Sequence, residues 1–298
     1  MRAVVLGSAA GGGFPQWNCR CENCRLAWAG DPRVKPRTQS SIAISRDGES
    51  WLLLNASPDL RQQILVTPAL WPREGVRHSP IAGVWLTNAD IDHVAGLLTL
   101  RERQAFTLYG STAVLAALDA PVFRVLDAAV VPRRAVEPGD SIEPLPGLAV
   151  EAFVAPGKTA LYLESGEVAI GIEDGATIGL DIRADGRRLV YLPGCAAISD
   201  IVRQRIAGAD VMLFDGTTFT DDEMVAQGLS AKTAHRMGHL AMSGPNGSIA
   251  GLSDVAVDRR IFIHINNTNP VLREDSAERA FVLRAGWEIA FDGMEIAL

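Results

Sequence analysis

The sequence lacks any run of apolar residues long enough to cross a membrane, and it has no excess of positive charge. Its 298 residues include 28 Lys and Arg against 35 Asp and Glu, a net charge of −7. No basic stripe is present that could neutralise the phosphates of a nucleic acid. The N-terminal apolar run stops at Gly7, which is too short for a secretory signal or a membrane span. We therefore expect a cytoplasmic protein that binds no nucleic acid and has no membrane span.

Cysteine and histidine are also scarce, at four and five residues. Three of the cysteines crowd into NCRCENC, a spacing at which disulfides between them are unfavourable. Cys19, Cys21 and Cys24 therefore indicate a metal site, although three ordinary surface thiols are the alternative. Tetrahedral zinc needs four donors, so one must come from elsewhere in the chain. By residue type, Cys195 is the candidate.

The apolar pattern, 48% of the chain, consists of short runs broken by turns, which predicts mainly β-strands around a large core. We expect strands within 1–7, 41–45, 51–57, 81–87, 106–110, 148–154, 159–165, 168–174, 177–192, 211–217 and 260–266. Helical patterns occupy 94–104, 111–119, 199–208, 247–254 and 274–286. Strand runs covered by helices predict an α/β sandwich, and the Asp-Gly turns predict much antiparallel pairing. No linker or repeat divides the chain.

Polar groups gather where two of these strands end. The segment TNADIDHVAGL places Asn88, Asp90, Asp92 and His93 directly after a buried strand. Oxygen ligands and an imidazole this close together would repel one another or stay solvated unless a cation binds them. The alternative is a solvated turn before a helix, with Asp92 as its N-cap. His264, inside IFIHINN, lies where another strand meets a polar loop, a place where sites are often built.

The segment TNADIDHVAGL resembles the metal loop H-x-H-x-D-H of the metallo-β-lactamase superfamily. The whole chain, through NCRCENC, HRMGHL, IHINNTNP and FDGMEIAL, resembles the coenzyme PQQ synthesis protein B family. This resemblance implies a metallo-β-lactamase-like four-layer αββα sandwich formed by a single domain, 1–298, with an N-terminal Cys-rich metal loop at about 17–25. The superfamily's phosphodiesterase branch has a similar Cys cluster that binds structural zinc. The same role is implied for Cys19, Cys21 and Cys24, and Asn267 stands where that branch has its fourth ligand.

Several ligands of the superfamily's two-metal site are replaced in this chain. Asn88 and Asp90 stand at the first two histidines of the pattern. The middle histidine falls near Gly157, and the bridging aspartate falls near Gly194. We therefore expect one active-site metal ion rather than two.

The resemblance leaves Asp92, His93 and His264 as the metal ligands, with Asp90 as a possible further oxygen donor. Asn88 and Asn267 are expected to hydrogen-bond to the ligands, although Asn88 could instead coordinate the metal directly. Two imidazoles and one carboxylate on one face of a metal are typical of non-haem Fe(II) oxygenases, although the same donors accept Zn²⁺, Mn²⁺ or Cu²⁺. We expect Fe(II) in the active site and structural zinc at the cysteines.

Two further residues are expected to act in catalysis. His239 in HRMGHL matches the histidine that acts on substrate in related hydrolases, which implies general acid–base chemistry. Asp215 ends the expected strand VMLFD and matches an acidic position near the site, where it would orient a histidine or a ligand. Lys158 and Arg236 could meet substrate carboxylates, with ordinary solvated surface residues as the alternative.

The resemblance implies a role in the biosynthesis of pyrroloquinoline quinone (PQQ). The expected reaction is Fe(II)- and O₂-dependent hydroxylation of the tyrosine-derived ring in a Glu–Tyr cross-linked intermediate. The partners would be this small-molecule PQQ precursor, O₂ and other proteins of the PQQ pathway. Two alternatives remain open: a zinc hydrolase of phosphodiesterase type, and a soluble carrier that helps PQQ or its precursor reach the periplasm.

Overall fold

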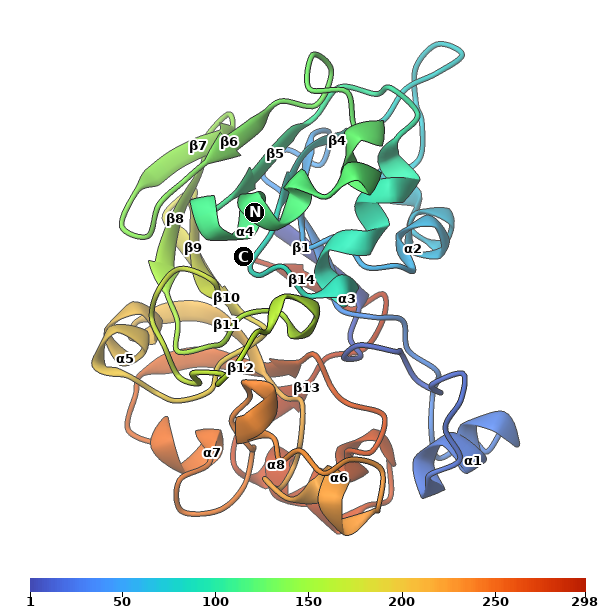
Figure 1. The fold of residues 1–298 in the computed structure, drawn as a ribbon, viewed down its shortest axis with the longest axis vertical. Coiled ribbons are helices and arrows are strands. Elements are labelled where there is room, and N and C mark those ends of the chain that lie inside the picture. The colour runs from blue at the N-terminus through green and yellow to red at the C-terminus, as the bar shows by residue number, and fades with distance from the viewer.

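The computed structural model describes all 298 residues and contains two mixed β-sheets (Figure 1). In spatial order, the first sheet contains β14 (Glu295–Ala297), β1 (Arg2–Gly7), β2 (Ser41–Ser45), β3 (Trp51–Leu54), β4 (Ile81–Trp85), β5 (Thr107–Gly110) and β6 (Arg133–Ala135). The second contains β13 (Trp287–Ile289), β12 (Val257–Ile263), β11 (Ala209–Asp215), β10 (Arg187–Leu192), β9 (Ile178–Ala184), β8 (Leu148–Val154) and β7 (Ser141–Leu145). Both sheets combine parallel and antiparallel pairs, so the expected antiparallel pairing accounts for only part of them.

Helices cover the outer face of each sheet. The α-helices are α1 (Glu22–Trp28), α2 (Leu60–Val66), α3 (Ile91–Val94), α4 (Thr112–Ala116), α5 (Asp200–Ile206), α6 (Glu223–Ala226), α7 (Ser248–Gly251) and α8 (Ala277–Arg284). Short 3-10 helices are η1 (Pro68–Leu70), η2 (Ala95–Leu100), η3 (Ala117–Asp119), η4 (Pro121–Val125), η5 (Leu161–Leu163), η6 (His235–Met237) and η7 (Pro270–Leu272). Contacts of α2 and α4 with the first sheet and of α5 and α8 with the second place helices on both outer faces.

Three apolar clusters correspond to the spaces between these layers. The central cluster joins inward-facing residues of both sheets, such as Ile42 and Leu52 with Leu180 and Leu213. A second cluster lies between the first sheet and its helices, and a third lies between the second sheet and its helices. Alternating side chains of each strand therefore contribute to different layers, which is why both faces of the central strands are apolar. The expected α/β sandwich with two sheets inside and helices outside is confirmed.

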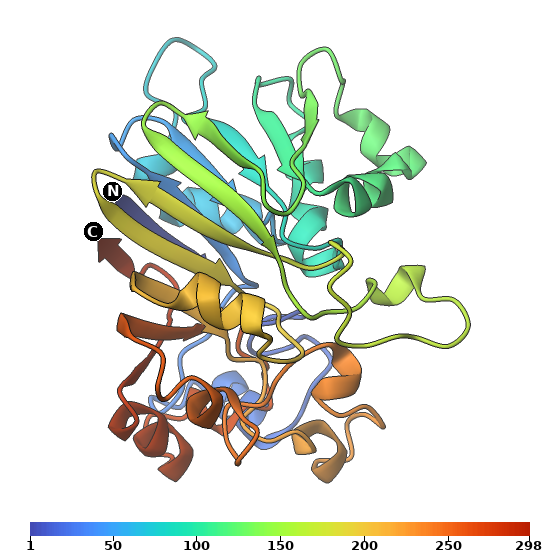
Figure 2. The same cartoon turned by 90° about the vertical axis from the view of Figure 1, so that its left-hand side faces the viewer.

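Two expected strands are absent. The segments 159–165 and 168–174 form the connection between β8 and β9, whose only regular element is η5. Gly166 and Gly171 have φ angles of 67° and 76° in this connection, a left-handed conformation that interrupts an extended strand. The apolar side chains of η5 are exposed instead of buried in a sheet. Figure 2 shows this loop standing out from the sheets on the right.

The two ends of the chain lie side by side (Figure 2). Antiparallel pairing of β14 with β1 joins them, and the Leu298 amide donates to the Met1 carbonyl at 3.0 Å. Just before β14, Asp292 accepts hydrogen bonds from Ser8 and Thr38. The closing FDGMEIAL segment therefore completes the first sheet. No helix in the structure has the length and apolarity that a membrane crossing requires.

Candidate metal centre

A carboxylate and two imidazoles meet at the edge where β4 and β12 end. Asp92 and His93 belong to α3, which begins six residues after β4, and His264 directly follows β12. The Asp92 Oδ2 atom lies 3.0 Å from His264 Nε2 and 3.9 Å from His93 Nε2. All three donor atoms lie within 4.8 Å of one another. The three residues named from the sequence therefore converge, and Asp92 faces His264 instead of capping its helix.

The backbone at His264 contributes to this convergence. Its φ angle is 60°, a left-handed conformation that a non-glycine residue adopts only under structural constraint. The constraint comes from the backbone on its C-terminal side, because the Ile265 amide donates to the Ser8 carbonyl at 2.9 Å. The Ala10 amide in turn donates to the Ile265 carbonyl at 2.9 Å. The chain thus turns sharply out of β12 and directs the imidazole toward α3.

Hydrogen bonds on the far sides of the rings leave the facing nitrogens available. His93 Nδ1 lies 2.6 Å from the Asn88 Oδ1 atom, which can only accept, so Nδ1 carries the proton. The His93 Nε2 atom is buried without any hydrogen-bond partner. His264 Nδ1 lies 2.9 Å from the hydroxyl of Thr217. A buried, unpartnered nitrogen facing a carboxylate fits a divalent metal ion, which would satisfy both.

The protonation states of these donors suit a metal. Burial lowers the pKa of His93 to about 4, so the ring is neutral near pH 7. Burial alone would raise the pKa of Asp92, but His93 and His264 outweigh it and lower that pKa below its usual range. A neutral imidazole and an ionised carboxylate are the forms that coordinate metal ions.

Asp215 and His239 form a hydrogen-bonded pair next to these donors. The fully buried Asp215 carboxylate accepts from His239 Nδ1 at 2.8 Å, from the Cys195 amide and from Thr217. The ring of His239 stacks on His264 with centroids 5.2 Å apart. Burial opposes protonation of His239, but the Asp215 charge outweighs it and raises the pKa of His239. Asp215 is thus occupied in orienting His239 and Thr217.

Asn88 and Asp90 flank the three donors without joining them. The Asn88 Nδ2 group donates to Asp90 Oδ2 at 2.9 Å while its Oδ1 atom accepts from His93. Asp90 lies outside the group whose donor atoms are within 4.8 Å of one another, although it lines the same cavity. Burial and the neighbouring Asp92 charge raise the pKa of Asp90.

The glycines at the replaced ligand positions differ in the space around them. A Cβ atom on Gly157 would lie 2.1 Å from the Thr177 hydroxyl, so no side chain fits there. A Cβ atom on Gly194 would meet only His239 Cε1 at 3.8 Å and Asn88 Nδ2 at 4.0 Å. Neither position supplies a donor, and the space beside Gly194 is open.

A cavity of about 430 Å³ gives access to the donors. Its walls are formed by Ala10, Gly11, Asp90, Asp92, Lys158, Leu161, Thr217, Ser230, Lys232, Met237, His239, His264 and Asn266. A larger cavity of about 720 Å³ lies beside the cysteines, but it contains no histidine. We therefore place the chemistry in the smaller cavity.

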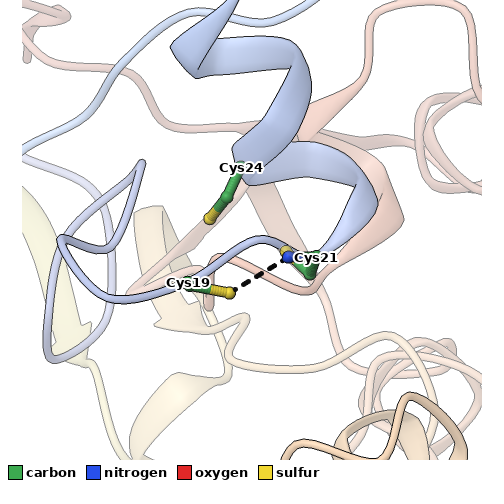
Figure 3. A group of neighbouring side chains, drawn as sticks. All are labelled: Cys19, Cys21 and Cys24. Carbon is green, nitrogen blue, oxygen red and sulfur yellow. Dashed lines mark hydrogen bonds between the residues drawn. The ribbon is translucent and has the colours of Figure 1, made fainter.

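The three clustered cysteines converge on one point at the start of α1 (Figure 3). Their sulfur atoms face the Asn267 side chain, whose Nδ2 atom lies 3.1 Å from Cys19 Sγ, 3.7 Å from Cys21 Sγ and 3.3 Å from Cys24 Sγ. A hydrogen bond from Cys21 lowers the pKa of Cys24 to about 6, which favours one thiolate in the group. Three thiols with one thiolate and a polar fourth neighbour fit a zinc ion.

Cys195, the candidate for the fourth donor by residue type, does not join the three clustered cysteines. Its thiol donates to the Ala197 carbonyl at 2.9 Å, and its amide donates to Asp215. Cys195 therefore belongs to the surroundings of Asp215, because the turn after β10 directs it into the core of the second sheet and its helices.

Sequence reasoning missed Thr217, which joins Asp215, His239 and His264 through one hydroxyl. Its position two residues beyond the strand end VMLFD was the available signal. Lys232 was missed as well, and nothing in its local pattern marks it as lining the cavity.

Comparison with known proteins agrees with this fold and site. Residues 50–265 match the family model described as the beta-lactamase superfamily domain. A two-sheet fold with a metal loop after β4 and a histidine after β12 defines a metallo-β-lactamase-superfamily protein. Structural similarity to a diphosphatase of the PhnP family, with a TM-score of 0.69 at 21% identity over 100% and 97% of the two chains, shows the fold alone.

Within that superfamily, the chain belongs to the coenzyme PQQ synthesis protein B family. It is 58% identical to coenzyme PQQ synthesis protein B of Methylorubrum extorquens (strain PA1) over 100% of both chains. It is 51% identical to the Rhizobium meliloti (strain 1021) protein, over 100% of this chain and 98% of the relative. The crystal structure of Zn(2+)-bound PqqB from Methylobacterium extorquens matches with a TM-score of 0.99 at 58% identity, over 100% of both chains. The family resemblance and the fold expected from the sequence are confirmed.

Proposed function

We propose that this chain acts in PQQ biosynthesis as a hydroxylase that uses one divalent metal, Fe(II), and O₂. The substrate would be the tyrosine-derived ring of a Glu–Tyr cross-linked precursor. Full-length identity to coenzyme PQQ synthesis proteins supports the pathway. The reaction type depends on the metal site.

The observation that carries the proposal is one set of three donors whose neighbouring set is already engaged. That second set, Asp215, His239 and His264, shares His264 with the first, and its carboxylate accepts hydrogen bonds from His239 and Thr217. Asp92, His93 and His264 provide one carboxylate and two imidazoles. A two-metal hydrolytic site needs ligands for ions about 3.5–4 Å apart, including a bridging carboxylate. Gly157 and Gly194 offer none of these ligands. Fe(II) held by the three donors would supply O₂ activation, the chemistry associated with two histidines and one carboxylate.

His239 would act as a general acid in this reaction. Asp215 accepts its Nδ1 proton and fixes the ring, so the other nitrogen remains for the substrate in the cavity that His239 lines. Asp215 raises the pKa of His239, which favours the protonated ring that would donate a proton to a developing oxyanion. The remaining polar groups of the cavity would orient the substrate.

A zinc hydrolase is the second candidate, because the 58% identical PqqB is described as Zn(2+)-bound. The same three donors accept zinc, and zinc does not activate O₂ through a change of oxidation state. The two candidates therefore differ in their requirement for iron and oxygen.

The test is oxygen uptake by protein loaded anaerobically with Fe(II) and supplied with the cross-linked precursor. We expect uptake coupled to a hydroxylated product, and its loss in His264→Ala and Asp92→Ala. His235→Ala is the matched control, because this histidine is exposed and does not line the cavity that contains Asp92. Equal turnover with zinc in the absence of oxygen would contradict hydroxylation and favour the hydrolase.

A further inference from the structure

Lysine is rare in this chain, and two of its three lysines line one cavity. The sequence contains 28 basic residues, of which only Lys35, Lys158 and Lys232 are lysines. Two of these three, Lys158 and Lys232, line the cavity that contains Asp92, His239 and His264. Lys35 is 72% exposed and pairs with Glu274. In a chain that otherwise uses arginine, this placement indicates a need for compact ammonium groups at the site.

Lys158 is held in position by its surroundings. Its stem packs against Gly238, where an added Cβ would lie 3.0 Å from Lys158 Cγ. The side chain is only 10% exposed, and its ammonium donates to the Thr159 carbonyl at 3.0 Å and to Glu164 Oε1 at 2.8 Å. An ammonium has three donors, so one remains for a ligand.

The negative charge of Glu164 is shared between two cations. Its second carboxylate oxygen accepts from Arg236 Nη2 at 3.1 Å. One carboxylate between a lysine and an arginine leaves a net positive charge at this side of the cavity. The loop that carries η5 thus fixes Lys158 through Glu164 without neutralising the whole group.

Lys232 has no counter-ion in the structure. It is half-buried in the segment before η6, and its ammonium forms no salt bridge and no hydrogen bond. Neither cavity lysine forms a salt bridge with Asp90 or Asp92. Leu161 and Met237 add apolar surface to the wall of the same cavity. The wall therefore combines two ammonium groups with apolar side chains that a ring could contact.

We propose that Lys158 and Lys232 are substrate-recognition residues that bind two carboxylate groups of one aromatic polycarboxylate. An ammonium–carboxylate hydrogen bond is charge-assisted, and it is strengthened where water is partly excluded. The inference rests on the proposed function in one respect, that the same cavity binds the substrate and the metal. It concerns recognition only and requires no redox step.

The test uses benzene-1,3,5-tricarboxylate as the probe and zinc-loaded full-length protein, so that no turnover occurs. Titration calorimetry compares the parent with Lys158→Met and Lys232→Met, which keep most of the unbranched side chain and remove its charge. We expect each substitution to weaken binding about tenfold or more. Lys35→Met is the matched control and should bind as the parent does. Metal content is measured in every variant.

Uncharged benzene-1,3,5-tricarboxamide has a similar shape and should bind much more weakly to the parent. The proposal is overturned if the tricarboxylate fails to bind, or if both cavity variants bind it as the parent does. Equal weakening by Lys35→Met, or equal binding of the tricarboxamide, also overturns it. Because zinc is redox-inactive, these outcomes do not depend on oxygenase activity, and loss of oxygen uptake would leave them unchanged.

Discussion

At the scale of single residues, one amide side chain organises the candidate metal donors. Asn88 accepts the Nδ1 proton of His93 and donates to Asp90, so it determines which His93 nitrogen faces Asp92. A histidine at this position, as in the superfamily pattern, would be a metal ligand itself. The replacement would thus convert a ligand position into one that supports a neighbouring candidate ligand.

Asn88→Ala should weaken metal binding about 10–100-fold, because His93 would lose the partner that fixes its tautomer. Titration with Mn²⁺ followed by electron paramagnetic resonance measures this site selectively, since Mn²⁺ prefers oxygen and nitrogen donors to thiolates. Asn18→Ala, at an exposed position, is the control. An unchanged Mn²⁺ affinity in Asn88→Ala would show that the hydrogen bond has no role in binding.

At the scale of elements, short segments after strands carry both sites. The loop after β12 supplies His264 to the metal donors and Asn267 to the cysteines. Glu223, the first residue of α6, accepts from the Phe219 amide and from Thr268 in the same loop. Burial raises the pKa of Glu223 to about 7 from its ordinary 4.5. Helix α6 and the loop are therefore joined through a carboxyl group that burial makes harder to ionise.

The contribution of Glu223 to the free energy of unfolding should fall as pH rises from about 4.5 to 7, opposite in sign to that of His93, whose pKa is lowered from 6.5 to about 4. In this window the folded protein keeps the Glu223 proton that the unfolded chain releases, so each rise in pH favours unfolding. Glu223→Gln should remove this dependence and gain about 1–3 kcal/mol over the parent at pH 8. Urea unfolding across this range measures the effect.

Glu278→Gln is the control, because Glu278 lines the same cavity as Glu223. The same pH dependence in the parent and in Glu223→Gln would contradict the assignment of the effect to this carboxyl group.

At the scale of the whole molecule, the two sheets bring together residues that lie far apart in the chain. Asp92 and His264 are 172 positions apart, and Asn267 lies 248 positions from Cys19. Asp92 and Cys19 follow strands of the first sheet, whereas His264 and Asn267 follow β12 of the second sheet. Packing of the sheets therefore creates both candidate metal sites.

Zinc-saturated protein should contain two metal ions per chain, one at each site, as measured by plasma mass spectrometry after dialysis. His264→Ala should retain the ion at the cysteines, and Cys24→Ser should retain the ion at Asp92, because the sites share no ligand. A third ion would indicate the two-metal arrangement of a hydrolase.

The local pattern alone predicts much of this protein. Alternating and continuous apolar runs identify β2, β8 and β11, because side-chain direction in a strand depends on neighbouring positions only. Close spacing likewise identifies the three cysteines and the Asp92–His93 pair, whose members lie within a few residues. The family resemblance adds the αββα arrangement.

Only the tertiary structure decides which distant groups meet. The loop at 159–174 has the apolar pattern of strands, but its glycines adopt left-handed angles and no sheet edge receives it. Cys195 resembles a fourth zinc donor by type, yet it packs beside Asp215, and Asn267 faces the thiols instead. Such contacts form between residues that lie far apart in the sequence and meet only because the two sheets pack together. The spacing of residues along the chain does not determine that packing.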